Sequence, residues 1–308
     1  MNKTEKILNN FLDLYWVRPE IAVWRTLDVL QMQSIKINSP SIDMGCGDGS
    51  FMFTCLGGKT DDDYDVYRTI NTTNNFFERT DIHNQRTNLK PKIITKPKHS
   101  ISIGLDLKQN LLDKAEAFHV YDNLVQHNAN FKLPFDDEQF KTIFSNTFYW
   151  TKNIEKTLSE AKRICSTSGK LIIFLPDQKF KDLLIYNEFI KNGYKWAKIL
   201  DRGIYKNVGN HCFTFKKWES LFTKIGLKIE YNSNFLSQRF IKIWNIGLRP
   251  YSPFLIEMSN KLKLNERTQI KKRVIKEMMP LLKSYIDYEM SNVGKNNCFH
   301  MFVLSKLK

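Results

Sequence analysis

Residues 41–51, with the sequence SIDMGCGDGSF, constrain the fold more than any other part of the chain. They have the pattern of a short buried strand, a glycine-rich turn and the start of a helix. Gly45, Gly47 and Gly49 allow positive φ angles and a close approach of the backbone, which larger side chains would block. The helix that follows offers unpaired N–H groups to a polar ligand. The stretch predicts an α/β fold with a nucleotide-type cofactor site, although a lone turn of this kind is also compatible with a structural role.

The same order of strand, acid and helix occurs again further along the chain. Residues 101–106 are an apolar run that ends in Asp106, and residues 109–115 continue with helical spacing. An aspartate in this position also suits a helix N-terminus. The pattern then predicts strands at 124–127, 142–145 and 170–175, a helix at 155–165 and a turn at Gly169.

With Asp43 two residues before the first glycine, the pattern D-x-G-x-G-x-G resembles the first motif of class I S-adenosylmethionine-dependent methyltransferases. The dinucleotide fingerprint G-x-G-x-x-G fits less well, because the third glycine comes one residue early. Residues 40–178 are similar to the small-molecule branch of that family, with a type 11-like core in which L-P-F follows the third strand. The resemblance implies a doubly wound, seven-stranded, mostly parallel Rossmann-like sheet with an antiparallel final hairpin, and S-adenosylmethionine as the cofactor.

The resemblance also implies roles for individual residues. Asp43 would orient the methionyl ammonium directly or through water, and Asp106 would accept hydrogen bonds from the ribose hydroxyls. Asn128 stands where the family usually has Asp, so its amide oxygen would accept from the adenine amino group. The other cofactor contacts expected from the resemblance are Gly45, Cys46, Gly47, Gly49, Leu107, Ala129 and Asn146.

The distance between the two motifs departs from the family pattern. Between Gly49 and Asp106 lie 56 residues, whereas a helix, a turn and a strand need only about 20. An insertion at about residues 57–100 is therefore expected. Asp65 could instead be the ribose acid, but the residues around it lack the apolar run of a central parallel strand.

Helical spacing of apolar residues predicts two helices before the sheet, at residues 7–16 and 21–32. In the family such helices pack over the cofactor and close the acceptor pocket, so residues 1–38 are expected to form a helical cap. Trp16 and Arg18 are its expected acceptor contacts. The aromatic side chains of this segment could equally dock the helices on the core.

The last two strands of the sheet are expected at residues 227–231 and 299–304. This divides the chain into a methyltransferase core at 39–234 and 298–308 and a helical lid at 235–297. Arg249, placed by the proline that follows it, is predicted to pair with an anionic group of the acceptor or to form a structural ion pair.

Ligands of open α/β sheets bind beyond the carboxyl ends of the strands. Tyr149, Trp150 and Asp177 follow such ends and are expected to meet the acceptor. Methyl transfer needs a base only if the nucleophile must lose a proton. His211 is the candidate base, although a loop histidine is also compatible with simple solvation, whereas His300 falls within a predicted strand and is expected to be a core residue.

Charge and cysteine content limit the partners and the compartment. Residues 1–150 contain 17 Lys and Arg against 19 Asp and Glu, whereas residues 151–308 contain 30 against 13. The excess of positive charge in the second half favours an anionic partner, such as an acidic saccharide, RNA or a membrane surface, or reflects solvated Lys-rich helices. Five cysteines without a C-x-x-C pattern indicate reduced thiols, a cytoplasmic protein and no metal site.

The sequence therefore predicts an enzyme that transfers a methyl group from S-adenosylmethionine to a small-molecule or saccharide acceptor, with an anionic acceptor as one option. Two alternatives remain open: an RNA methyltransferase, and a non-catalytic binding module on a methyltransferase core.

Overall fold

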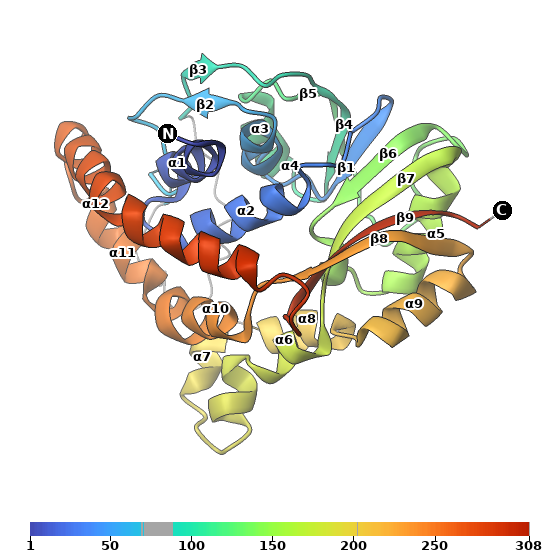
Figure 1. The fold of residues 1–308 in the computed structure, drawn as a ribbon. Helices are drawn as coiled ribbons and strands as arrows, with labels where there is room; N and C mark the ends of the chain where they lie inside the picture. The colour runs from blue at the N-terminus through green and yellow to red at the C-terminus, as the bar shows by residue number, and fades with distance from the viewer. Residues whose placement is uncertain (69, 71–88, 202, 308) are drawn as a thin grey trace.

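The computed structural model describes residues 1–68, 70, 89–201 and 203–307 of the 308-residue chain. A seven-stranded sheet with the order β5-β4-β1-β6-β7-β9-β8 forms its centre (Figure 1). The five strands from β5 to β7 are parallel, and β9 is antiparallel to both of its neighbours. This confirms the predicted fold class. The strands are β1 (Ser41–Met44), β4 (Ile101–Asp106), β5 (Tyr121–Gln126), β6 (Phe140–Ser145), β7 (Cys165–Pro176), β8 (Leu227–Phe235) and β9 (Phe299–Lys306).

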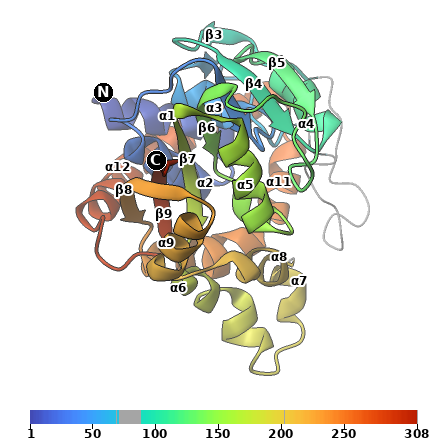
Figure 2. The same cartoon turned by 90° about the vertical axis from the view of Figure 1, so that its right-hand side faces the viewer.

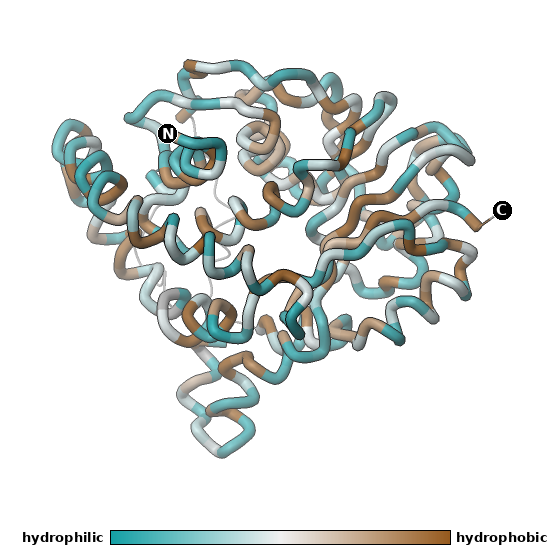
Figure 3. The backbone as a smooth tube through the Cα atoms, viewed as in Figure 1, coloured by the Kyte–Doolittle hydropathy of each residue, from teal (hydrophilic) through white to brown (hydrophobic). Residues whose placement is uncertain are grey.

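The strand order reverses at β1, which has β4 on one side and β6 on the other. Asp43 of β1 lies opposite Gly104 of β4 and Phe144 of β6. In open α/β sheets the crevice at such a reversal, beyond the carboxyl ends of the strands, is where ligands bind. The strands that flank it are buried, and β6, β7 and β9 run through the hydrophobic centre of the protein in Figure 3.

Helices cover both faces of the sheet (Figures 1 and 2). One face packs against α5 (Ile154–Ile164) and α9 (Phe215–Lys224), and the other shares a hydrophobic core with α1 (Lys3–Tyr15) and α2 (Pro19–Gln31). Helix α12 (Leu264–Ser291) packs on α1 and α2. The remaining helices are α3 (Ser50–Cys55), α4 (Gln109–Glu116), α6 (Gln178–Asp182), α7 (Ala197–Asp201), α8 (Ile204–Val208), α10 (Gln238–Lys242) and α11 (Ser252–Asn260), with short 3₁₀ or π turns η2 (Phe148–Trp150), η3 (Tyr186–Ile190), η4 (Gly209–His211), η5 (Ile243–Leu248) and η6 (Arg249–Tyr251). No helix among the described residues combines the length and the apolar character needed to cross a membrane.

The predicted turn at Gly169 lies inside the span of β7, Cys165–Pro176. The pairing of β7 with β6 shifts by three residues there, because Cys165 lies opposite Phe140 whereas Lys170 lies opposite Thr142. A Cβ on Gly169 would lie 2.7 Å from the Sγ of Cys165 and 3.0 Å from the carbonyl oxygen of Phe140. Residues four positions apart in an extended strand are about 13 Å apart, so the chain turns at Gly169, where a side chain would crowd the start of β7.

The insertion forms a small sheet of its own, in which β2 (Lys59–Thr60) pairs with β3 (Ile93–Thr95). Residues 69 and 71–88 of the predicted insertion lie outside the described residues. The alternative in which Asp65 is the ribose acid is wrong. Its carboxylate accepts hydrogen bonds of 3.0 and 2.9 Å from Arg267 of α12 and one of 3.1 Å from Nε1 of Trp16.

These bonds tie the insertion to the helices at both ends of the chain. They also correct the prediction for Trp16, whose indole is buried and docks the first helix instead of lining an acceptor pocket.

Candidate cofactor and acceptor site

The glycine loop, residues 45–49, connects β1 to α3. The backbone N–H groups of Gly45 and Cys46 donate to the carbonyl oxygen of Leu105, which fastens the loop to β4. Gly47 has a φ of 58°, and a Cβ added there would meet no protein atom within 4 Å. A Cβ on Gly49 would instead lie 3.1 Å from Ala115. Gly47 is therefore the point at which the loop presents bare backbone to open space.

Asp106 lies directly beside this point. Its Oδ2 accepts a 3.0 Å hydrogen bond from the N–H of Gly47, and its Oδ1 accepts a 2.9 Å bond from the N–H of Lys108. A carboxylate oxygen has a second lone pair, so both oxygens can accept a further hydrogen bond. The two backbone donors orient the carboxylate in the way that a pair of adjacent hydroxyl groups on a ribose requires.

Asp43 is buried at the carboxyl end of β1. Its Oδ2 accepts a 2.6 Å hydrogen bond from the hydroxyl of Tyr121, whereas its Oδ1 is buried and has no partner among the described residues. Burial raises the pKa of Asp43 to about 7, although the bond from Tyr121 opposes this shift. A buried carboxylate oxygen without a donor fits a ligand that brings its own cationic donor. This free oxygen of Asp43 and the open space at Gly47 together suit the binding of S-adenosylmethionine.

Asn128 does not have the role that the resemblance implied. Its Oδ1 accepts hydrogen bonds from the backbone N–H and the side-chain amide of Asn130, at 3.0 and 2.8 Å. Both lone pairs of this oxygen are thereby used, so the side chain shapes the turn after β5.

The remaining predicted cofactor residues lie around the crevice. Ala129 is half-buried, Asn146 is buried, and Leu107 exposes 55% of its surface next to Asp106. Cys46 is buried, and burial raises the pKa of its thiol well above the usual range. The thiol therefore stays protonated and fills space in the loop.

The N-terminal helices reach down to the glycine loop. The hydroxyl of Tyr15, at the end of α1, lies 2.7 Å from Oγ of Ser50, the residue after the loop. From α2, the Nη1 of Arg25 donates to Asp28 over 3.1 Å, and the guanidinium lies 5.4 Å from the ring centre of Phe51. Sequence reasoning missed Arg25 and Asp28, although two charged residues three positions apart on a helix that is otherwise largely apolar on its inner side were a usable signal.

The charge of Arg25 acts on the acidic groups of the crevice. Burial raises the pKa of Asp43 to about 7 and that of the Tyr149 hydroxyl to about 12, and the positive charge of Arg25 partly offsets both shifts. Burial raises the pKa of Asp28 from 3.8 to about 7, although Arg25 opposes the shift. Helix α2 therefore places a half-buried cation, Arg25, beside a buried carboxyl group, Asp28, with a pKa near neutral pH.

The substitution Asp28→Asn is expected to flatten the pH dependence of stability. Because the folded-state pKa of Asp28 is raised, its contribution is fully present below about pH 4 and is lost as the pH rises through 7, on the order of 4 kcal/mol. Thermal unfolding from pH 4 to pH 8 measures this slope. Asp122→Asn, at an exposed position, serves as the control, and parallel curves for Asp28→Asn and the wild type would contradict the assignment.

On the acceptor side, the ring of Tyr149 packs edge-on against Phe299 at 5.5 Å, and Trp150 exposes 47% of its surface. His211 is buried, with its Nδ1 2.9 Å from the carbonyl oxygen of Tyr149. Because a carbonyl oxygen only accepts hydrogen bonds, Nδ1 carries the proton, and Nε2 is the basic nitrogen of the neutral ring.

Three predicted acceptor contacts have structural partners. Asp177 accepts from the N–H of Lys179 and pairs with Nε2 of His300 at 3.1 Å. Burial raises the pKa of Asp177, but these contacts outweigh it and hold the pKa below its usual value. The carboxylate therefore caps α6 and joins the ends of β7 and β9, and His300 is buried as expected.

The other two are arginines. Arg18 is half-buried, and its Nε donates to Glu20 over 2.7 Å. Arg249 is buried and donates to the carbonyl oxygens of Leu200 and Asp201, at 2.8 and 3.0 Å. Arg249 thus joins the segment after β8 to the segment after β7. Its guanidinium is used for these structural hydrogen bonds and not for the predicted contact with an acceptor.

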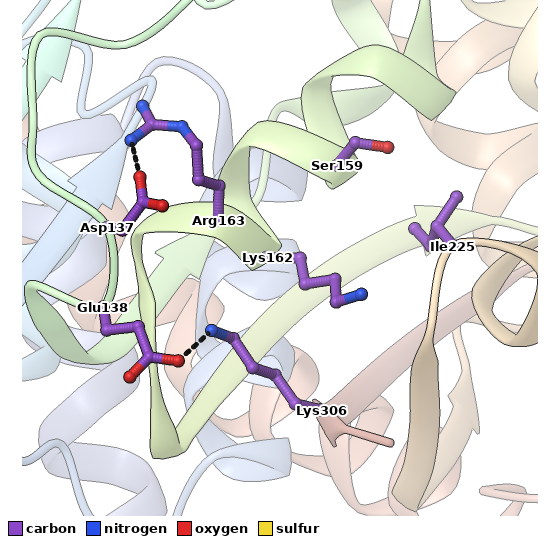
Figure 4. A pocket seen from close by; sticks show the side chains of 7 residues that line it. All are labelled: Asp137, Glu138, Ser159, Lys162, Arg163, Ile225 and Lys306. Carbon is purple, nitrogen blue, oxygen red and sulfur yellow. Dashed lines mark hydrogen bonds and ion pairs between the residues drawn. The ribbon is translucent and has the colours of Figure 1, made fainter. Parts of the chain in front are cut away.

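A hollow at the opposite edge of the sheet, shown in Figure 4, does not belong to this site. Its walls include the ion pairs Asp137–Arg163, at 2.7 Å, and Glu138–Lys306, at 2.9 Å. Glu138 precedes β6, and Lys306 ends the antiparallel β9. The hollow therefore lies at the amino-terminal edge of the parallel strands, far from the edge that holds Gly47 and Asp106.

Replacing Asp106 with alanine is expected to weaken the binding of S-adenosylmethionine by about 1.5 to 3 kcal/mol, the range for hydrogen bonds to a charged group. Isothermal titration calorimetry measures the loss. Asp122→Ala removes an exposed carboxylate on the neighbouring strand and should leave the affinity unchanged. An unchanged affinity in Asp106→Ala would exclude this carboxylate as the ribose ligand.

Comparison with known proteins agrees with this geometry. Residues 87–173 match the family model described as methyltransferase domain. The match includes Asp106 and starts within the insertion, so it does not extend to the glycine loop. A search of curated proteins found no match.

Solved structures of low sequence identity are also similar. A methyltransferase from Thermotoga maritima that depends on S-adenosylmethionine is 16% identical, with 69% of this chain and 75% of the other covered and a TM-score of 0.44. The cyclase SpnF is 12% identical, with 93% of this chain and 82% of the other covered and a TM-score of 0.47. The YcgJ protein of Bacillus subtilis is 12% identical, with 92% of this chain and 97% of the other covered and a TM-score of 0.43. Residues 87–173 therefore carry the match to a methyltransferase domain, and the strand order and the glycine loop with its neighbouring carboxylates agree with a class I, S-adenosylmethionine-dependent fold of that kind.

Proposed function

We propose that this methyltransferase modifies a small-molecule or saccharide acceptor that is held beneath α1 and α2. The observation that carries this proposal is the contact between Tyr15 of α1 and Ser50, directly after the glycine loop. It brings the helical cap down onto the cofactor loop. A site covered by these helices would favour a small acceptor, because a folded RNA would need an open approach.

Different residues of the crevice would bind different parts of the cofactor and the acceptor. S-adenosylmethionine supplies an electrophilic methyl group when it is bound. Gly47 and Asp106 would hold the ribose side, and the free oxygen of Asp43 would accept from the ammonium group. Such a transfer depends mainly on alignment of the two reactants. Where the acceptor must lose a proton, Nε2 of His211 is the nitrogen that would take it.

Arg25 supports an anionic group on the acceptor. Its guanidinium is the charged group that α2 presents near Phe51 and Asp43, and among the described residues Asp28 is the carboxyl group that pairs with it. Because Asp28 titrates near neutral pH, the pair keeps part of its positive charge available. A carboxylate or phosphate of the acceptor would complete the pairing.

The test has two stages. Calorimetry with S-adenosylmethionine and S-adenosylhomocysteine measures binding by the purified protein. Incubation of a cell extract with methyl-labelled cofactor then shows where the label goes, and mass spectrometry identifies the product. Label in anionic small molecules is expected, with none in the Gly47→Val variant.

Label in the RNA fraction, together with a steep loss of RNA affinity as salt is added, would overturn the small-molecule proposal in favour of RNA. Binding of the cofactor without label in any fraction would favour the non-catalytic alternative.

A further inference from the structure

A protrusion formed by residues 185–201 extends away from the rest of the protein, at the bottom of Figures 1 and 2. It consists of η3, a turn in which Gly193 has a φ of 95°, and α7. It follows α6, which begins directly after the carboxyl end of β7. The protrusion therefore leaves the sheet at the edge that also holds the cofactor loop.

The tip of the protrusion is aromatic. Tyr194 exposes 52% of its surface and Trp196 exposes 60%. Both rings contact the half-buried Phe189, with ring centres 6.2 and 6.0 Å away, and they lie 6.4 Å from each other. The three rings form one apolar surface, and an exposed surface of this kind on a projecting segment is typical of an interaction site.

Positive charge surrounds these rings. Lys191, Lys195 and Lys198 are exposed, and the sequence contains no acidic residue from position 189 to position 200. Within the part of the chain that the structure describes, none of the three lysines forms an ion pair. The neighbouring acid Glu188 lies 3.9 Å from the Nζ of Lys242 instead. The tip therefore combines exposed aromatic rings with ammonium groups that have no carboxylate to neutralise them.

Buried hydrogen bonds hold both ends of the protrusion. At its start, the N–H of Ile185 donates to Oδ1 of Asn245 over 2.7 Å. At its end, Arg249 donates to the carbonyl oxygens of Leu200 and Asp201. Because Asn245 and Arg249 both come from the segment after β8, one structural unit fixes the base and presents the tip in a defined position.

We propose that the protrusion docks this protein on an anionic lipid bilayer. Tyr and Trp rings prefer the headgroup level of a bilayer, because their apolar bodies and polar tips suit that boundary. Tyr194 and Trp196 would enter at this level, and the three lysines around them would pair with lipid phosphates. The docking does not depend on the acceptor proposed above.

The ring geometry favours a lipid surface over a single-stranded nucleic acid. Base stacking needs aromatic faces that are free and that follow one another along a groove. Here Phe189 and Tyr194 meet at 74°, and Tyr194 and Trp196 meet at 66°. Phe189 and Trp196 meet at 40°, so no two of the three rings lie parallel on the projecting tip, which suits insertion into a headgroup layer.

Co-sedimentation of the full chain with lipid vesicles tests the proposal. We expect binding to vesicles of equal parts phosphatidylglycerol and phosphatidylcholine, weaker binding to pure phosphatidylcholine, and a loss of binding at high salt. The triple variant Lys191→Glu, Lys195→Glu, Lys198→Glu is expected to lose affinity for the mixed vesicles by at least about a hundredfold. The double variant Tyr194→Ser, Trp196→Ser is expected to lose about a hundredfold in affinity for both the mixed vesicles and the pure phosphatidylcholine vesicles.

Two matched controls separate local from general effects. Tyr231→Ser replaces an aromatic residue of similar exposure on β8, and Lys3→Glu, Lys6→Glu, Lys36→Glu makes the same change in net charge at exposed positions elsewhere. Both should bind vesicles as the wild type does, and all variants should keep the wild-type melting temperature and cofactor affinity. Absence of wild-type binding to mixed vesicles, or equal losses in the control variants, would overturn the proposal. Binding of a single-stranded RNA that only the protrusion variants lose, without vesicle binding, would assign the surface to nucleic acid.

Discussion

Replacing Gly47 with valine is expected to abolish the binding of S-adenosylmethionine and to leave the protein folded. A Cβ at this position meets no protein atom within 4 Å, so the larger side chain enters only the space in front of the loop. That space is the one that a ligand of Asp106 must occupy, because the N–H of Gly47 donates to this carboxylate. We expect an affinity loss of at least about a hundredfold, or about 3 kcal/mol, by calorimetry.

Gly294→Val is the matched control. Gly294 also has a positive φ, of 81°, and no atom within 4 Å of an added Cβ, but it lies in the turn before β9. Both variants bear the cost of a β-branched residue in the left-handed region, so their melting temperatures should fall to a similar extent. If Gly47→Val still binds the cofactor, or if Gly294→Val loses binding as well, the loop does not approach the ligand in the way described.

Replacing Asp65 with alanine should lower the free energy of unfolding by about 3 to 5 kcal/mol, because it leaves the buried guanidinium of Arg267 without its carboxylate. The two side chains are almost fully buried and form two hydrogen bonds, at 3.0 and 2.9 Å. Trp16 loses its partner in the same variant. Urea unfolding measures the change, and cofactor affinity should stay at the wild-type value wherever the protein is folded.

The double variant Asp65→Ala, Arg267→Met should be more stable than Asp65→Ala alone, since it also removes the unpaired charge. Asp287→Ala, which breaks the exposed pair with Lys283 on the same helix, should cost less than about 1 kcal/mol. A loss below about 1 kcal/mol in Asp65→Ala would show that this pair does not hold the insertion in place.

The parts of the site that the sequence predicts are encoded within a few neighbouring residues. The glycine loop follows directly from β1, and Asp106 ends β4, so strand patterns and turn residues place both without knowledge of distant contacts. The order of the parallel strands then follows from general rules of connection. This is why the fold class and the cofactor loop are predictable.

The incorrect assignments have partners far away in the sequence. Asp65 pairs with a residue 202 positions later, and Arg249 reaches back 49 positions to Leu200. A local pattern shows that such a residue is charged but not what it meets. Arg25 and Asp28 were overlooked because burial, which gives a charged pair on a helix its significance, is a property of the folded state.

The position of β9 between β7 and β8 governs how the protein can mature during translation. β8 is complete at Phe235, but its partner begins only at Phe299, after residues 236–298 have been added. At about 5 to 20 residues per second this takes on the order of 3 to 13 seconds. Throughout that interval the edges of β7 and β8 remain unpaired next to the ribosome, where exposed strand edges recruit other chains. Slow codons within residues 236–298 would prolong this exposure, so the yield of folded protein depends on how fast that segment is translated.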